Sequence, residues 1–229
     1  MRIAVLLYGR IGKFKETYEN MLNSIGRQHT VDIFCSSDYE PEKVVNEFKE
    51  LYKPVKSVHE RIINANNLSA YPGRLSDTDN NRLFNLECQL INKMRVFMLL
   101  EEHLRDCEVS YDLVLCTRID ILYKEPFQFE NIPFIDISLL PNPSVVTYKP
   151  FEKDKIYVPI FRDYSEGLND NMAFGTLDIM RKYCYIYKNV LHLLAEKLSI
   201  PHSENLNLAN LKFQNVPIER FFITYTIVR

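Results

Sequence analysis

Arg118 and Asp120 are the first residues of this sequence whose types and spacing indicate chemistry. They follow the apolar run at 111–117, and strand alternation places both charges on one face, with Ile119 on the other. Such a pair suits a diphosphate, because Asp120 can ligate a hard divalent cation (Mn²⁺ or Mg²⁺) and Arg118 can neutralise the remaining charge. An ion pair at a strand end explains the two residues equally well.

Two loops nearer the amino end have polar residues of the kind that hold a nucleotide. Tyr8, Gly9 and Arg10 follow the apolar run at 3–7, and Ser36 and Asp38 follow the run at 31–35. Glycine allows close approach of the backbone to a phosphate, and the short polar side chains can hydrogen-bond a base or ribose. The alternatives are an ordinary strand-to-helix turn and a helix cap, because neither the P-loop pattern nor the dinucleotide fingerprint is present.

Parallel strands place both loops at one edge of a sheet, where open α/β sheets bind their ligands. We therefore expect uridine or a similar nucleotide in a cleft formed by Tyr8, Gly9, Arg10, Ser36 and Asp38. Lys93, on a long predicted helix, is added to the same cleft.

Two later residues are candidates for catalysis and metal binding. Asp170, in the segment Asn169–Gly175, is a candidate base for an incoming hydroxyl, and an Asx helix cap is the alternative. His202, close to Glu204, is a candidate second metal ligand beside Asp120, and a structural histidine is the alternative.

The elements that must position these residues follow from hydrophobic periodicity. Continuous apolar runs predict buried strands at 3–7, 31–35 and 111–117, and a further strand is expected at 55–59. Helical spacing predicts helices at 12–25, 41–51, 81–104, 175–198 and 203–211. A long loop is expected at 61–80, short strands in the proline-rich stretch 126–159, and a closing strand within 220–228.

This order predicts an α/β fold with an open, mainly parallel central sheet flanked by helices and a small appended β region. The length of 229 residues fits one domain (1–229).

Composition excludes several classes of protein. With 46% hydrophobic and 25% charged residues, the chain is neither disordered, collagen-like nor a coiled coil. The net charge of -2 gives no support for bulk electrostatic binding of nucleic acid. No apolar stretch is long enough for a transmembrane segment or a signal-peptide core, and the five cysteines include no C-x-x-C, so a reducing cytoplasm is expected.

Several motifs, taken in order, resemble one family. These are Tyr8-Gly9-Arg10, the stretch from Val114 to Asp120, the stretch from Asp170 to Gly175, and a tail with His202-Ser203-Glu204 that ends at Ile227-Val228-Arg229. Together they resemble the GT-A glycosyltransferases of the WavE-like and large-DNA-virus type, in which an Arg-x-Asp element replaces Asp-x-Asp. The resemblance covers nearly the whole chain.

The resemblance implies an enzyme that transfers a hexosyl or deoxyhexosyl group from a nucleoside-diphosphate sugar, a UDP-sugar, to a saccharide acceptor of a surface glycan or glycoprotein. It also implies that Asp120 meets the diphosphate through Mn²⁺ or Mg²⁺. Within the single domain it implies a nucleotide-sugar-binding half at 1–125 and an acceptor-side half at 126–229. The alternatives from other classes are a nucleotide- or carbohydrate-binding module without catalysis, and a nucleotidyltransferase, which normally needs two or more carboxylates close together.

Overall fold

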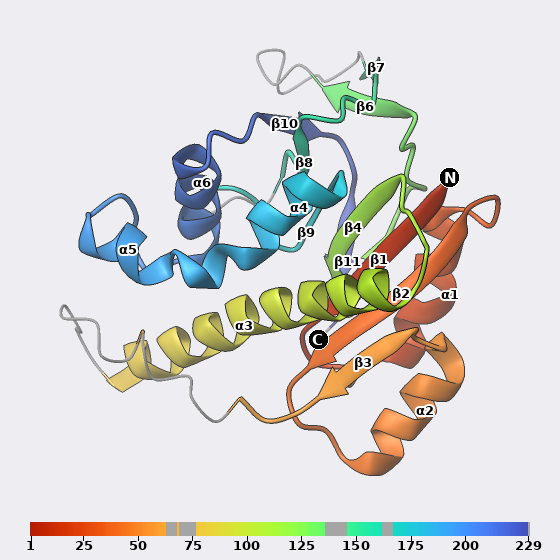
Figure 1. Cartoon of the computed structure of the whole chain (residues 1–229), viewed down its shortest axis with the longest axis horizontal. Helices are drawn as coiled ribbons and strands as arrows, with labels where there is room; N and C mark the ends of the chain where they lie inside the picture. The colour runs from red at the N-terminus through yellow and green to blue at the C-terminus, as the bar shows by residue number, and fades with distance from the viewer. Residues whose placement is uncertain (63–67, 69–76, 136–145, 162–166, 229) are drawn as a thin grey trace.

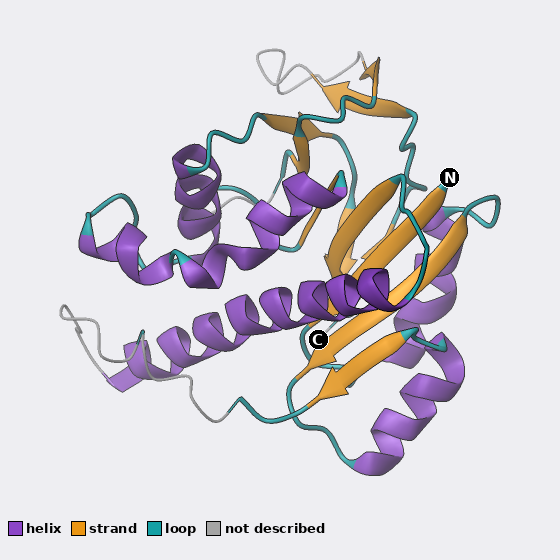
Figure 2. Ribbon diagram, in the orientation of Figure 1, coloured by secondary structure: helices purple, strands orange, loops and turns teal. Residues whose placement is uncertain are grey.

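A seven-stranded sheet runs through the computed structural model, which describes residues 1–62, 68, 77–135, 146–161 and 167–228. The strand order is β10-β8-β9-β4-β1-β2-β3 (Figures 1 and 2). The strands are β1 (Arg2–Tyr8), β2 (Thr30–Ser37), β3 (Lys56–His59), β4 (Leu113–Arg118), β8 (Ile156–Pro159), β9 (Met172–Gly175) and β10 (Ile218–Phe221). Only β9 is antiparallel to its neighbours β4 and β8, so the other six strands of this sheet share one direction.

Strand β1 shows why a continuous apolar run was needed at the centre of the sheet. Ile3, Val5 and Leu7 belong to one hydrophobic cluster, whereas Ala4 and Leu6 belong to the cluster on the opposite face. All five side chains are fully buried. A strand covered on both faces cannot alternate apolar with polar residues, and this strand does not.

Helices cover the two faces of the sheet. Helices α1 (Phe14–Ile25) and α2 (Glu42–Tyr52) pack with the first cluster, and α3 (Asp77–Asp106) and α4 (Leu177–Cys184) pack with the second. Figure 1 shows α3 running across its face of the sheet. After α4 the chain continues through the 3₁₀ helix η2 (Tyr185–Lys188), α5 (Val190–Ala195) and α6 (Ser203–Phe213).

Two small antiparallel pairs are added to the main sheet. One consists of β5 (Ile121–Tyr123) and β11 (Tyr225–Ile227), and the other of β6 (Asn131–Ile135) and β7 (Val146–Pro150). The amide of Val228 donates to the carbonyl of Asp120 at 2.9 Å, so the carboxyl-terminal strand lies directly beside the Arg-x-Asp element.

The predicted α/β fold class, with its mainly parallel central sheet, flanking helices and small appended β region, is confirmed. Two elements differ from the prediction. The helix predicted at 175–198 is shorter and interrupted, because Met172–Gly175 pairs with β4 and the helix begins only at Leu177. The predicted closing strand is divided into β10 and β11, and between them Glu125 accepts hydrogen bonds from the amide and hydroxyl of Thr224.

The long loop predicted at 61–80 lies mainly outside the described residues, and α3 already begins at Asp77. Among the described residues, no helix is both long and apolar enough to cross a membrane.

Candidate active site at the carboxyl edge of the sheet

Sheet register brings the predicted residues of three strands together. Tyr8, the last residue of β1, is paired with Ser36 of β2 on one side and with Arg118 of β4 on the other. The amide of Arg118 donates to the carbonyl of Asn171 at 3.1 Å, which brings the segment containing Asp170 to the same edge. Residues far apart in the sequence therefore meet where open α/β sheets bind ligands.

Arg118 and Asp120 form a two-point ion pair. Nε of Arg118 donates to Oδ1 of Asp120 at 2.8 Å, and Nη2 donates to Oδ2 at 2.6 Å. Hydrogen bonding to Asp120 raises the pKa of the Arg118 guanidinium, while burial acts in the opposite direction. Both side chains keep partial exposure, 32% and 22%, so a ligand can reach the pair.

The same pair bears on metal binding. Asp120 offers the hard oxygen atoms that Mn²⁺ and Mg²⁺ prefer, but Arg118 engages both. His202 is close to another carboxylate, with Nδ1 2.6 Å from Oε2 of Glu204. In the part of the chain that the structure describes, no three His, Cys, Asp or Glu side chains are grouped as metal ligands. This arrangement does not fit a metal site built by the protein alone, and the roles of Asp120 and His202 as ligands stay predictions.

Asp170 is held by two contacts at the edge of the sheet. Oδ2 accepts a hydrogen bond from the amide of Gln89 at 2.6 Å, and the main-chain carbonyl accepts one from the hydroxyl of Tyr8. Its other carboxylate oxygen, Oδ1, has no hydrogen bond with any described residue. The residue is 6% exposed. The helix-cap alternative for Asp170 is wrong, because β9 intervenes and Thr176 occupies the cap position of α4.

A buried amide network fixes the segment around Asp170. Nδ2 of Asn169 and Nδ2 of Asn171 both donate to the hydroxyl of Tyr225, at 2.6 and 2.9 Å. The amide of Asn171 donates to Oδ1 of Asn169 at 3.0 Å. The carboxyl-terminal strand β11 thus positions Asp170 through its two neighbours.

The edge of β2 carries a short polar relay. The hydroxyl of Ser36 donates to Oδ1 of Asn92 at 2.8 Å, and Nδ2 of Asn92 donates to Oδ1 of Asp38 at 3.3 Å. Ser36 and Asn92 are buried, whereas Asp38 is partly exposed. Asp38 is therefore the group that the relay presents to a ligand.

The loop after β1 has open space beside its glycines. Gly9 has φ +102°, a conformation that favours glycine, and its amide donates to the carbonyl of Ser36 at 3.2 Å. A Cβ added to Gly9 or Gly12 would meet no atom within 4 Å. Arg10 is exposed in the same loop. The loop can thus be approached closely from solvent.

Lys93 lies behind this edge as a fully buried lysine. Its ammonium donates to the hydroxyl of Tyr183 at 2.9 Å and lies 5.1 Å from the ring centroid of Tyr8 and 4.7 Å from that of Tyr183. Burial raises the pKa values of the Tyr8 and Tyr183 hydroxyls well above the usual value for tyrosine, so both side chains stay neutral. No carboxylate among the described residues forms an ion pair with Lys93. Lysine is almost never fully buried without a charged partner.

Sequence reasoning missed Gln89, Asn92 and Tyr225. For Asn92 a signal existed, because this polar residue lies in an apolar stretch of the predicted helix. The apolar residues of that stretch are Leu90, Val96 and Phe97. Tyr225 gave no signal of its own, since its role depends on pairing between β5 and β11.

Comparison with known proteins finds similarity to solved structures alone. No protein-family model matches the sequence, and no curated protein matches it. Among solved structures, the chain is similar to the galactosyltransferase LgtC, crystallised in complex with donor and acceptor sugar analogues. The sequences are 10% identical, the similarity covers 92% of this chain and 70% of that chain, and the TM-score is 0.46.

Proposed function

We propose that this protein is a glycosyltransferase that moves a sugar from a nucleoside-diphosphate sugar, a UDP-sugar, to a saccharide acceptor of a surface glycan or glycoprotein. The observation that carries the proposal is the meeting of the Arg118–Asp120 pair, the Asp170 carboxylate and the relay ending at Asp38 at one edge of the sheet. Cation, candidate base and nucleoside-binding group are the three parts that sugar transfer from such a donor requires.

In this proposal the nucleoside lies beside Asp38, and Gly9 and Arg10 face the phosphates. Ser36 is a positioning residue, because its buried hydroxyl fixes Asn92 and not the ligand. Tyr8 is also a positioning residue, because its hydroxyl donates a hydrogen bond to the main-chain carbonyl of Asp170.

The proposed reaction breaks the bond between the anomeric carbon and the diphosphate oxygen and forms a bond to the acceptor oxygen. Negative charge grows on the departing nucleoside diphosphate, and Arg118 stabilises it once it exchanges Asp120 for phosphate oxygens. If the configuration inverts, Asp170 takes the proton of the acceptor hydroxyl; if it is retained, Asp170 binds the sugar.

A dependence on Mn²⁺ or Mg²⁺ is part of the proposal as a prediction. Asp120 would have to leave Arg118 to ligate the ion, and phosphate oxygens and water would supply most other ligands. We further propose one domain with donor binding by 1–125 and acceptor binding by 126–229, working in a reducing compartment, where the five free cysteines stay unpaired.

The test incubates the protein with a panel of nucleoside-diphosphate sugars, once with Mn²⁺ and once with EDTA. The measured quantity is the release of the nucleoside diphosphate. We expect the parent to hydrolyse or transfer at least one donor. We expect Asp170→Asn to lose this activity. Donor binding without turnover would identify a binding module instead, and pyrophosphate release from a nucleoside triphosphate would identify a nucleotidyltransferase.

A further inference from the structure

The segment from α5 to the end of α6 exposes an unusual group of large apolar side chains. Leu191, Leu198, Ile200 and Phe213 are 49%, 54%, 53% and 48% exposed. They account for four of the ten exposed large apolar side chains among the described residues. Single exposed apolar residues are ordinary, whereas a group of them indicates an interaction surface. We name these four residues the α5–α6 surface.

The exposure of these residues is not the result of loose packing. The opposite sides of the two helices are buried in one cluster, which contains Leu193 and Leu194 of α5 and Leu206 of α6. The ring of Phe213 lies 5.1 Å from that of His192, next to Leu191, so the end of α6 lies against α5. The segment is thus anchored on one side and apolar on the other.

The charges around the α5–α6 surface are mainly positive. Four lysines in this region form no ion pair with any described carboxylate: Lys182, Lys188, Lys197 and Lys212. Between residues 188 and 213 the only exposed acid is Glu196. The whole chain has a net charge of -2, so this positive region is opposite in sign to the protein's net charge.

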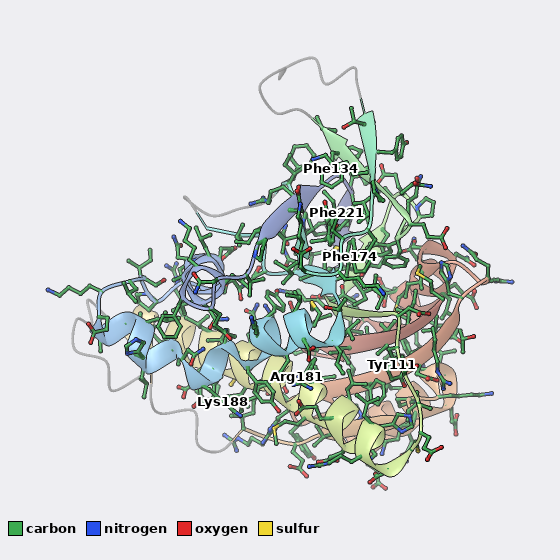
Figure 3. The ribbon with its side chains drawn as sticks, turned by 45° about the horizontal axis from the view of Figure 1, so that its top comes forward. Tyr111, Phe134, Phe174, Arg181, Lys188 and Phe221 are labelled. Atoms are coloured by element: carbon green, nitrogen blue, oxygen red, sulfur yellow. The ribbon has the colours of Figure 1, made fainter. Side chains whose placement is uncertain are left out.

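A basic pocket of about 490 Å³ adjoins this region; three cationic side chains (Arg181, Lys182 and Lys188) and one carboxylate (Glu101) line it, and Gln214 also contributes. Gln214 directly follows Phe213, so the pocket borders the apolar side chains. Lys188 lies over the ring of Tyr185 at 3.9 Å, and Arg181 is engaged by Glu101 and Asp178. Figure 3 shows Arg181 and Lys188 on the α4–α5 side of the molecule, away from Phe134 and Phe221.

We propose that the α5–α6 surface docks this protein on an anionic membrane. Its four apolar side chains enter the headgroup region, and the four lysines and the basic pocket bind lipid phosphates. Exposed lysines are depleted from protein–protein interfaces, whereas lysines flanking apolar side chains are typical of segments that bind a membrane surface. The proposal is independent of the reaction that the enzyme catalyses.

Vesicle flotation tests the proposal with the full chain. We expect binding to vesicles of phosphatidylcholine with phosphatidylglycerol, little binding to phosphatidylcholine alone, and release by salt. Lys188→Gln with Lys197→Gln should weaken partitioning about 25-fold, from about fivefold per lysine. Leu198→Ser with Ile200→Ser should abolish stable binding.

The matched control is Lys43→Gln with Val55→Ser. It removes an exposed lysine on α2 and an exposed apolar side chain directly before β3. This control should bind like the parent, and all variants should keep the parental melting temperature. Absence of parental binding to the anionic vesicles, or equal binding of all variants, overturns the proposal. A concentration-dependent dimer that is lost in Leu198→Ser with Ile200→Ser, without vesicle binding, would assign the surface to a second copy and also overturn it.

Discussion

The guanidinium of Arg118 binds both carboxylate oxygens of Asp120, so the two charges at the end of β4 neutralise each other. A diphosphate offers Arg118 the same planar pair of oxygens that Asp120 offers. In the proposed function, donor binding would therefore be coupled to the opening of this ion pair. The same exchange would leave the carboxylate of Asp120 as the residue that could hold a divalent cation, which would supply charge stabilisation to the phosphates.

Asp120→Asn should remove the stimulation by Mn²⁺ and lower kcat/KM by about 10²-fold, the usual effect of losing one electrostatic group from such a site. The measurement is donor turnover across a Mn²⁺ titration and with EDTA. A variant as active as the parent at every Mn²⁺ concentration would remove Asp120 from the mechanism.

Arg118→Lys keeps the charge but loses the two-point geometry, so we expect donor KM to rise by roughly tenfold and the metal response to persist. Arg118→Ala should lose more, because no cation then faces the leaving phosphate. Equal losses in both variants would show that a charge without the two-point geometry of Arg118 contributes nothing at this position. Steady-state kinetics with varied donor separates these results.

Asp170→Asn should reduce kcat by about 10²-fold or more while the dissociation constant of the donor is retained, because a positioned base contributes about that much. The change alters shape little, and the amide of Gln89 can still donate to the remaining oxygen. Calorimetry for donor binding and single-turnover rates measure the two quantities. If the variant lost only thermal stability and turned over normally, Asp170 would be a structural residue.

The strands that form the edge of the candidate site could be predicted from the sequence. Continuous apolar runs can be buried on both faces only in the middle of a sheet, so β1, β2 and β4 were predictable, as was the alignment of their carboxyl ends. The reversed strand β9 was not, because four residues show no periodicity of their own and become a strand by pairing with β4.

The functions of individual side chains at the site were harder to predict. Lys93 was expected to line the cleft, but the helical spacing Leu90, Lys93, Phe97 places it on the apolar side of α3, and the structure buries it. The relay from Ser36 to Asn92 joins residues 56 positions apart, and only the packing of α3 on β2 brings them together.

Lys93→Met should weaken binding of a nucleoside diphosphate by roughly tenfold without lowering the free energy of unfolding. A methionine of similar volume removes the cost of keeping an unpaired charge out of water, which offsets the loss of the hydrogen bond to Tyr183. The binding loss corresponds to one unit charge acting over about 10 Å at an effective dielectric constant of about 20. Calorimetry with UDP and urea unfolding are the two measurements. Unchanged affinity together with lower stability would make Lys93 a purely structural residue.

His59 should make the stability of the fold depend on pH. Burial, with a smaller contribution from Lys49, lowers its pKa from 6.5 to about 4, and Nδ1 lies 2.7 Å from the hydroxyl of Ser37. Below pH 6.5 the unfolded chain therefore binds a proton at His59 that the folded chain does not bind until the pH approaches 4. Stability contributed by the neutral ring is complete above pH 6.5 and is lost as the pH falls toward 4.

His59→Gln keeps a polar side chain at this position and removes the titration. The parent should lose on the order of 1 kcal/mol more unfolding free energy than this variant between neutral pH and a pH just above 4, a value reduced for the partial exposure of the ring. Urea unfolding across this range measures the difference. Because the carboxylates titrate equally in both proteins, their common acid sensitivity cancels. Parallel stability curves for parent and variant would show that His59 has the same pKa in the folded and unfolded chains.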